Sequence, residues 1–595
     1  ANATTADYSI GIGQSALGIG VLTGDHNIAF GNGAGYDLTS GTYNILSGFQ
    51  AGYNVTTGNG NVFSGYQTGE NATTASFGIS IGYSAIGVGI MTGTDNTAIG
   101  RQAGNDLTSG EYNNFMGYQA GYNATTGDSN IAIGRQAIGG GVLTGTNNVV
   151  LGYQAGYDLT SGDHNILSGF QAGSNITTGT GNIFQGNEAG EFATTASYGI
   201  AIGYEAIASG VMTGSDNTAI GRIAGHDLTS GAFNNFIGYF AGANATTATN
   251  TIAIGTTALS TGVLTGTDNI AIGRLTGNDL TSGAYNNFIG YTSGANATTG
   301  NYNIAIGYAP INTGVLTGDD NTAIGRLAGQ DLTSGEYNFF GGYSAGLNAT
   351  TADNTIAIGR SAMGVGILTG DGNTAIGLAA GQDLTSGTYN NFMGFRAGYN
   401  ATTADSNIAI GRTAIGLGVL TGNSNVAIGH SAGYDLTSGA FNLIMGYIAG
   451  GNVTTGADNT ILGTSAGFSL TTGSNNTDVR IPGVDFYIDN GNVGIGTSSP
   501  SDLLDLSSAD PRIRLTNTGG GYCLVRTGST DGSLILDADA GNTAANSDMI
   551  MRVDGTEHMR INSSGNVGIG TSSPSTALGV VGTVTATAFA GDGSA

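Results

Sequence analysis

The feature that most constrains this chain is a repeat of 17 or 18 residues that fills about four fifths of its length. Each repeat carries an NTAIG-like motif. The residue four places before the Gly of that motif, most often Asn, is taken as coil position 1. These anchors run from Ser9 to Asn476 in 19 steps of 17 and 8 steps of 18 residues, which together cover 467 residues. Gly recurs every four to six residues and no 3.6-residue period is present, so helices are disfavoured.

A longer period lies on top of this one. Most of the array cycles through three versions of the repeat that span 52 residues: NTAIGRQAGNDLTSGEY, NNFMGYQAGYNATTGDS and NIAIGRQAIGGGVLTGTN. A repeat this regular implies that one coil has nearly the same structure as every other coil.

Seventeen residues suffice for two or three short strands separated by Gly and Asx/Ser/Thr turns. Stacked coils would pair in parallel about 4.8 Å apart, giving a rod roughly 130 Å long. We therefore predict an all-β fold: a parallel β-solenoid (β-roll) of about 27 coils of 17–18 residues, followed by a small β domain. The expected domains are the solenoid over 1–476, a β connector over 477–500, a small β domain over 501–574 and a C-terminal β tail over 575–595.

The repeat positions have separate physical roles. Gly at position 5 and Gly of the LTSG-like turn allow positive φ or close backbone approach. Asn at position 1 can form side-chain amide ladders between stacked coils. Positions 2 to 4 are often apolar on both strand faces, as in Ile131-Ala132-Ile133. A strand with two apolar faces requires burial on both, and since the solenoid core covers one, a neighbouring chain would cover the other.

Composition excludes several classes of protein. The 595 residues include 109 Gly, 5 Pro and 1 Cys, with a formal charge of −26, and all 14 basic residues are Arg. A single Cys excludes a disulfide scaffold, and nucleic-acid binding is not expected without a basic stripe. We expect no membrane insertion, because no run of about 18 apolar residues occurs. The chain opens on Ala1 in the middle of a repeat, so we expect it to be a piece of a longer polypeptide.

We expect no enzyme, because a repeat array presents the same residues on every coil instead of one irregular cluster. No catalytic residue, cofactor-binding residue or metal ligand is predicted, and no cofactor is expected. HExxH and CxxC motifs are absent from the sequence. His26 and His164 lie in GDHN turns, for which we expect a solvated role. Aspartates at position 11 recur mostly every third coil, about 14 Å apart, which is too far for a shared Ca²⁺.

Two rows of repeat positions each allow two interpretations. One coil position carries Asn-x-Thr sequons, which are either glycosylation sites or Asx corners, the reading we favour. Position 6 alternates between Arg and aromatic residues, which could stack between coils or chains or contact a sugar. The sequons are at Asn54, Asn71, Asn123, Asn175, Asn244, Asn296, Asn348, Asn400 and Asn452, and the Arg are at Arg101, Arg135, Arg222, Arg274, Arg326, Arg360 and Arg412.

Beyond the repeats, the phrase GNVGIGTSSP occurs twice, at Gly491–Pro500 and Gly565–Pro574. The C-terminal sequence MRINSSGNVGIGTSSPSTALGVVGTVTATAFAGDGSA resembles the neck of bacteriophage tail fibres and tailspikes. In those proteins this region often precedes an endosialidase-type intramolecular chaperone that trimerises the fibre and cleaves itself off. The NTAIGRQAG-like coils also resemble the heads of trimeric autotransporter adhesins. Both resemblances imply a homotrimeric extracellular rod, and the first implies a chaperone after Ala595.

The sequence therefore predicts the structural shaft of a phage tail fibre, at the virion tail or otherwise extracellular, which presents a host-attachment tip. The expected partners are copies of the same chain and a host cell-surface glycan or protein. A bacterial cell-surface adhesin or extracellular filament is the alternative. An ice-binding solenoid that uses the Ser/Thr row is a third, and a polysaccharide-degrading tailspike would need a carboxylate cluster that interrupts the repeat.

Overall fold

The computed structural model describes residues 2–3, 5–18, 21–481, 484–489, 491–497, 499–508, 511–516, 522–527, 534–538, 547–588 and 590. Within these residues every regular element is a strand and no helix occurs. The prediction of an all-β fold is confirmed: the chain forms a parallel β-solenoid of about 28 turns and a small separate sheet domain. It divides into two compact units, residues 1–438 and 439–595.

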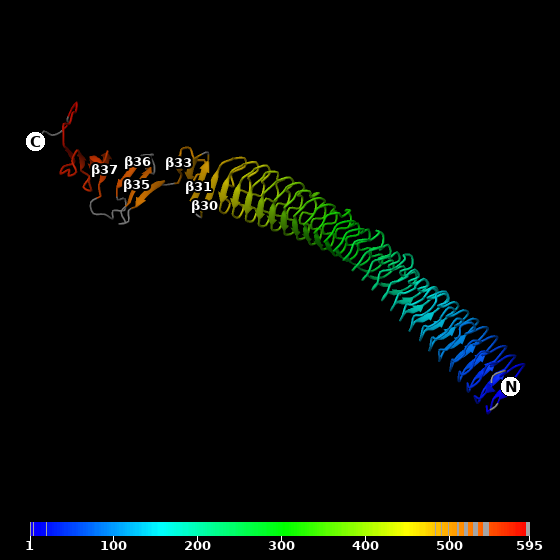
Figure 1. Ribbon diagram of the computed structural model, residues 1–595. Coiled ribbons are helices and arrows are strands. Elements are labelled where there is room, and N and C mark those ends of the chain that lie inside the picture. The colour runs from blue at the N-terminus through cyan, green and yellow to red at the C-terminus, as the bar shows by residue number, and fades with distance from the viewer. Residues whose placement is uncertain are drawn as a thin grey trace. The chain divides into compact units, whose positions relative to one another are not determined.

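The first unit is a stack of coils, blue to yellow in Figure 1, in which each coil contributes one strand at positions 2 to 4. A short pair, β1 (Asn2–Ala3) with β3 (Val21–Leu22), is also parallel. The stacked strands are β2 (Ile10–Ile12), β4 (Ile28–Phe30), β5 (Ile45–Ser47), β6 (Val62–Ser64), β7 (Ile79–Ile81), β8 (Thr97–Ile99), β9 (Asn114–Met116), β10 (Ile131–Ile133), β11 (Val149–Leu151), β12 (Ile166–Ser168), β13 (Ile183–Gln185), β14 (Ile200–Ile202), β15 (Thr218–Ile220), β16 (Asn235–Ile237), β17 (Ile252–Ile254), β18 (Ile270–Ile272), β19 (Asn287–Ile289), β20 (Ile304–Ile306), β21 (Thr322–Ile324), β22 (Phe339–Gly341), β23 (Ile356–Ile358), β24 (Thr374–Ile376), β25 (Asn391–Met393), β26 (Ile408–Ile410) and β27 (Val426–Ile428).

The coils pair in strict register. Ile131 lies beside Asn114 on one side and beside Val149 on the other, and the same coil position meets itself in every such pair. Coils of 17 and 18 residues keep this register, because the extra residue is taken up outside the strand. The parallel coil-on-coil pairing expected from the period is therefore confirmed.

In the 17-residue coils the apolar core is formed by positions 3, 8 and 12. The volumes of the side chains at positions 3 and 12 compensate each other in neighbouring coils. A coil with Phe115 at position 3 has the small Ala124 at position 12, whereas a coil with Ala98 at position 3 has Leu107 at position 12. All four side chains are buried. Close packing of the interior requires this compensation, because neither voids nor excess volume are tolerated.

Asn at position 1 forms the amide ladder expected from the sequence. In the coil of Asn113, the side-chain Nδ2 donates to Oδ1 of Asn96 at 3.1 Å and to the carbonyl of Gly127 at 2.8 Å. The backbone N–H of Asn113 donates to the same Asn96 oxygen at 3.0 Å. A buried polar side chain is stable only when its hydrogen bonds are made, so each amide fixes the register of the next coil.

Gly at position 5 is required by both conformation and space. Gly117 has φ of 137°, and a Cβ built on it would lie 2.4 Å from the carbonyl oxygen of Gly134 in the next coil. The Gly of the LTSG-like turn makes a comparable close approach, with 2.4 Å from a Cβ on Gly110 to the carbonyl of Gly127. Both columns confirm the role that the sequence assigned to them.

The second unit begins with two strands of the same coil type, β28 (Leu443–Met445) and β29 (Thr460–Leu462), paired in parallel. β30 (Thr477–Ile481) continues the parallel pairing on β29. The pairing then turns antiparallel through β31 (Val484–Asp489) and β32 (Asn492–Ile495), and β33 (Leu504–Leu506) lies parallel to β32. Parallel stacking therefore ends at an antiparallel hairpin.

Two further sheets follow in the second unit. β34 (Arg512–Thr516), β35 (Tyr522–Thr527) and β36 (Leu534–Ala538) form an antiparallel sheet. β37 (Met549–Val553), β38 (Thr556–Ile561), β39 (Val567–Ile569) and β40 (Leu578–Val580) form a mixed sheet, antiparallel except for the parallel pair β39–β40. The strands β33 to β39 lie within residues 501–574, and β40 lies within residues 575–595.

The two GNVGIGTSSP copies form the same local structure. In the first, β32 leaves an antiparallel hairpin and pairs in parallel with a later strand, Val493 beside Leu504. In the second, β39 does the same, Val567 beside Leu578. The loop bonds match as well, since the side chain of Asn566 donates to the carbonyl of Pro574 as its counterpart in the first copy does to Pro500. The phrase therefore encodes one strand–loop–strand module used twice.

Candidate functional site

The outer faces of the stacked strands carry a mainly apolar row on the first unit, which is interrupted at position 4 by Ser47, Ser64, Ser168, Gln185 and Gly341. In each stacked strand after β2 the middle residue points into the core and is buried, while the residues at positions 2 and 4 point outward. Ile133 at position 4 keeps 41% of its surface exposed. The sequence had shown both strand faces to be apolar, and the structure places the second apolar face at the surface of the single chain. The large exposed residues at position 4 of the first unit are Ile12, Phe30, Ile81, Met116, Ile133, Leu151, Ile220, Ile237, Ile254, Ile272, Ile289, Ile324, Ile358, Ile376, Met393 and Ile410.

Position 6 lies at the end of each strand and forms a column of Arg and aromatic side chains. Tyr118 lies between Arg101 and Arg135, with each guanidinium carbon 5.7 Å from the ring centroid. Where two aromatics are adjacent they stack, as Tyr66 and Tyr83 do with centroids 5.0 Å apart and ring planes 3° from parallel. Attraction of a cation to the ring face explains the alternation.

This stacking decides between the two interpretations of the column. A sugar binds an aromatic side chain through the ring face, but both faces of Tyr118 are covered by its neighbours along the stack. Only ring edges and guanidinium edges remain at the surface. The geometry therefore favours packing or an interface with another chain over a sugar-binding strip.

The seven position-6 Arg side chains are exposed, and none of them makes an ion pair within the described residues. In each coil that has one of these Arg at position 6, an Asp lies one or two residues before position 1. The pairs are Asp95 with Arg101, Asp128 with Arg135, Asp216 with Arg222, Asp268 with Arg274, Asp320 with Arg326, Asp353 with Arg360 and Asp405 with Arg412. Sequence reasoning had singled out the Arg but had missed their acidic counterparts.

The sequon amides hold the coils together. Nδ2 of Asn123, the atom that glycosylation would modify, donates to the carbonyl of Gly140 at 2.7 Å. Nδ2 of Asn400 donates to Leu417 at 2.7 Å in the same manner. The geometry favours the Asx-corner interpretation, because a glycan on these atoms would compete with an inter-coil hydrogen bond.

The Thr row is also engaged between coils. The hydroxyl of Thr108 donates to the carbonyl of Thr125 at 3.0 Å, and Thr160 does the same to Thr177. An ice-binding surface needs regular ranks of free hydroxyls, whereas these hydroxyls already donate to the backbone. The row therefore stabilises the stack.

The acidic and His residues form no cluster that resembles a metal centre. Within the described residues, no group of three or more His, Cys, Asp or Glu side chains lies close enough to hold a metal ion. Burial raises the pKa of the position-11 carboxyls of Asp106, Asp158 and Asp383. His26 is stacked between Tyr8 and Tyr43, with centroids 5.1 and 4.8 Å away, so its ring extends a surface stack.

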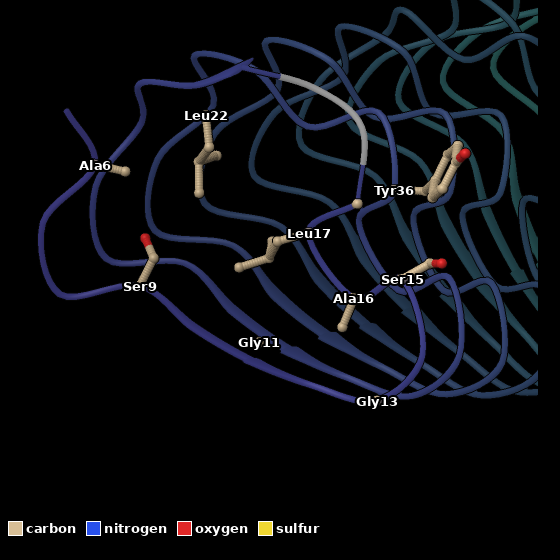
Figure 2. Close-up of a pocket in the computed structure, with 10 residues that line it drawn as sticks. Ala6, Ser9, Gly11, Gly13, Ser15, Ala16, Leu17, Leu22 and Tyr36 are labelled. Atoms are coloured by element: carbon tan, nitrogen blue, oxygen red, sulfur yellow. The ribbon is translucent and has the colours of Figure 1, made fainter. Parts of the chain in front are cut away.

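A cavity of about 340 Å³ opens at the first coils (Figure 2). Its walls include the core side chains of Leu17, Leu22 and Ala16, and its polar members are Ser9, Ser15 and Tyr36. Tyr36 is its one titratable lining side chain, so the lining offers no acid–base pair. Its composition is that of the solenoid core viewed from the end.

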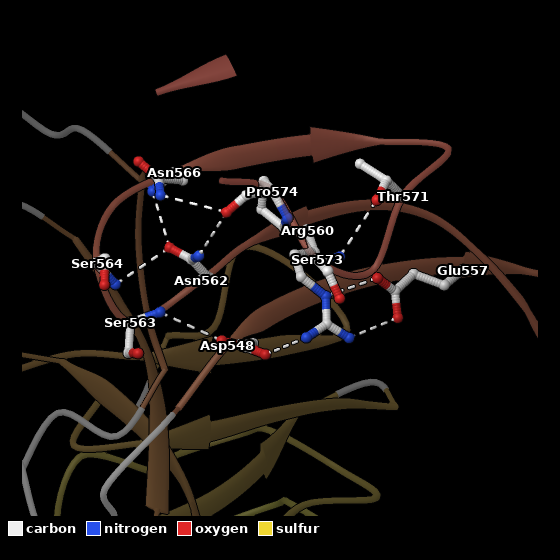
Figure 3. A network of polar contacts seen from close by, with 10 residues as sticks. All are labelled: Asp548, Glu557, Arg560, Asn562, Ser563, Ser564, Asn566, Thr571, Ser573 and Pro574. Atoms are coloured by element: carbon white, nitrogen blue, oxygen red, sulfur yellow. Dashed lines mark hydrogen bonds and ion pairs between the residues drawn. The ribbon is translucent and has the colours of Figure 1, made fainter. Parts of the chain in front are cut away.

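A polar network organises the last sheet of the second unit (Figure 3). Arg560 donates to both carboxylate oxygens of Glu557, at 2.6 and 2.7 Å, and also pairs with Asp548. The hydrogen bonds from Arg560 lower the pKa of Glu557. Asn562 and Asn566 both donate to the carbonyl of Pro574. These contacts connect β38 to the loop after β39 and present no open position for a substrate.

Comparison of the chain with protein-family models and with curated proteins gave no match. The described residues contain no helix that is long and apolar enough to cross a membrane.

Proposed function

We propose that this chain is a structural fibre shaft, namely the shaft of a phage tail fibre that holds a host-attachment tip away from the particle. The observation that carries the proposal is the unbroken coil-to-coil pairing in the first unit, where each strand lies in register between two others. Stiffness along the axis follows, because bending requires neighbouring coils to lose backbone and amide-ladder bonds together.

Self-association is part of the proposal. The outward side chains at positions 2 and 4 expose a row of Ile, Val and Met that soluble monomers seldom leave uncovered. Copies of the same chain, three in the homotrimer that the resemblance implies, would cover it. The tip would contact a host cell-surface glycan or protein, and the shaft would lie at the virion tail, outside the cell.

A bacterial cell-surface adhesin or filament is the second candidate, because the same rod would serve to extend a binding domain from a cell. Antibodies raised against the repeats distinguish the two on electron micrographs of virus particles and of cells from the source culture. Gold label along the tails of particles supports the proposal, whereas label confined to cell surfaces rejects it in favour of the adhesin.

A further inference from the structure

The outer strand face of the first unit has oppositely charged edges. Each Arg at position 6 lies at the end of a strand that has an Asp at its start, as in Asp216-Asn217-Thr218-Ala219-Ile220-Gly221-Arg222. The strand Thr218–Ile220 lies between the two charges, and no ion pair joins them within the described residues. Between the two edges lie positions 2 and 4, with Ile at position 4 of all seven strands and Ile or Thr at position 2.

Seven of the eight Arg of the first unit follow this rule of placement. The eight Arg of residues 1–438 are the seven at position 6 and Arg396 at position 7, and no Arg lies on the Asp edge. The face is therefore acidic along one side, apolar along its middle and basic along the other. Because the seven guanidinium groups are exposed and free of ion pairs within the described residues, their charge is available to a partner.

We propose that this face binds a second copy of this chain, in parallel orientation and in register. When two such faces meet about an axis parallel to the rod, the Asp edge of one copy lies opposite the Arg edge of the other on both sides. An antiparallel arrangement places Asp opposite Asp and Arg opposite Arg instead. The charge pattern therefore selects parallel cyclic association, and this inference specifies the interface on which the proposed shaft depends.

The register is selected by the same residues. Asp and Arg flank the same strand in all seven cases, so in-register copies align each Arg222 with an Asp216 at the same height along the rod. A shift by one coil would place most Arg opposite uncharged residues, because these charged strands recur every second or third coil, with one wider gap of five coils. The apolar middle adds area, since two partly exposed side chains on each of roughly 25 strands offer on the order of 1,000 Å². A stable interface needs about 800 Å² per partner.

Site-specific crosslinking tests the orientation. In a Cys523→Ser background, single substitutions Ser47→Cys, Ile202→Cys and Ile410→Cys place one thiol on the apolar row near the start, middle and end of the first unit. Parallel, in-register copies form same-site disulfides at all three positions, whereas antiparallel copies do so only at Ile202→Cys. Ser334→Cys, on an exposed corner away from this face, is the matched control and should stay uncrosslinked. Crosslinking only in the middle, or none in an otherwise folded protein, overturns the proposal.

Charge reversal tests the edges. Arg222→Glu, Arg274→Glu and Arg326→Glu together should raise the dissociation constant, measured by sedimentation, by at least about 10-fold. Adding Asp216→Arg, Asp268→Arg and Asp320→Arg should restore association, because the two edges have exchanged charge. Adding Asp227→Arg, Asp279→Arg and Asp331→Arg at position 11 restores the same net charge on another face and should not. Equal rescue by both sets rejects edge pairing, and neither result bears on where the shaft is located, which the antibody labelling decides separately.

Discussion

The side-chain oxygen of Asn234 accepts the backbone N–H of Thr251 at 3.0 Å, and the buried amide ladder stops there. The hydroxyl of Thr251 donates back to Thr249 at 3.3 Å instead of reaching the next coil. Within the described residues, the backbone N–H of Asn269 in that coil has no hydrogen-bond acceptor, whereas its equivalent Asn286 has one. A Thr at position 1 therefore marks a weak joint between two ladder segments.

Replacing this Thr should strengthen the joint. Thr251→Asn restores an acceptor for the backbone N–H of Asn269 and a donor for the carbonyl of Gly266, equivalent to the bond from Asn130 to Gly145. We therefore expect the free energy of unfolding to rise by about 1 kcal/mol. Chemical denaturation of the full chain measures it, and Thr355→Asn should behave alike. Thr247→Asn, at an exposed corner of the coil that precedes this joint, is the control. Equal effects of all three variants would show that the ladder contributes nothing specific.

The Gly column at position 5 should tolerate no side chain. Gly117→Ala combines a φ of 137° with a Cβ that would lie 2.4 Å from a backbone oxygen, so we expect a loss of about 3 kcal/mol in unfolding free energy. Gly341→Ala is the matched control, because its Cβ would meet only the side chain of Phe339 at 3.1 Å and its φ is ordinary. Thermal unfolding followed by far-UV circular dichroism compares them, and similar midpoints for the two variants would contradict the steric account.

The period of the sequence was enough to predict the coil length, the parallel register, the Gly columns and the Asn ladder. Each of these follows from one residue type at one coil position. The backbone conformation of Tyr112 and Gln119 could not be predicted, because they have φ of 59° and 55° and neither type favours that region. Hydrogen bonds to the preceding coil fix them, Gln119 N–H donating to Arg101 at 3.0 Å.

The candidate site was predicted only in part. Apolar positions 2 and 4 indicated a second covered face, and the Arg–aromatic column was recognised from its spacing. The acidic partners were missed because they lie at −1 in four strands, such as Asp216, and at −2 in the others, such as Asp128. The pairing of each Asp with an Arg becomes evident only when the residues on both sides of a strand are treated as the two edges of one surface. The structural equivalence of the two GNVGIGTSSP modules likewise needed the strand pairing.

Core volume should be exchangeable between positions of one coil. Phe115→Ala removes a fully buried ring, and we expect a loss of about 4 kcal/mol in unfolding free energy. The double variant Phe115→Ala with Ala124→Leu recreates the pattern of the preceding coil, Ala98 with Leu107, and should recover part of that loss. A double-mutant cycle from denaturant unfolding measures the coupling. Strictly additive effects would mean that the two positions do not share one space.

The half-buried carboxyl at position 11 should make stability depend on pH. Burial raises the pKa of Asp106 above its usual value near 3.8, so its ionised form is disfavoured in the folded state. Above the raised pKa the group is charged in both states and the folded state bears the whole desolvation cost. As pH falls through that pKa, the folded state takes up a proton before the unfolded state does, and the cost is relieved.

Asp106→Asn should therefore be more stable than the natural chain at pH 7, by an amount that shrinks on acidification. The amide should also gain an inter-coil bond, as Asn123 has with Gly140 at 2.7 Å. The reverse change, Asn123→Asp, is the matched control and should destabilise at pH 7 with a difference that likewise shrinks in acid. Unfolding free energies of both variants and of the natural chain, measured between pH 3 and pH 7, test this prediction. A pH-independent difference for both variants would mean that the hydrogen bond alone, and not desolvation of the carboxylate, sets the stability of this corner.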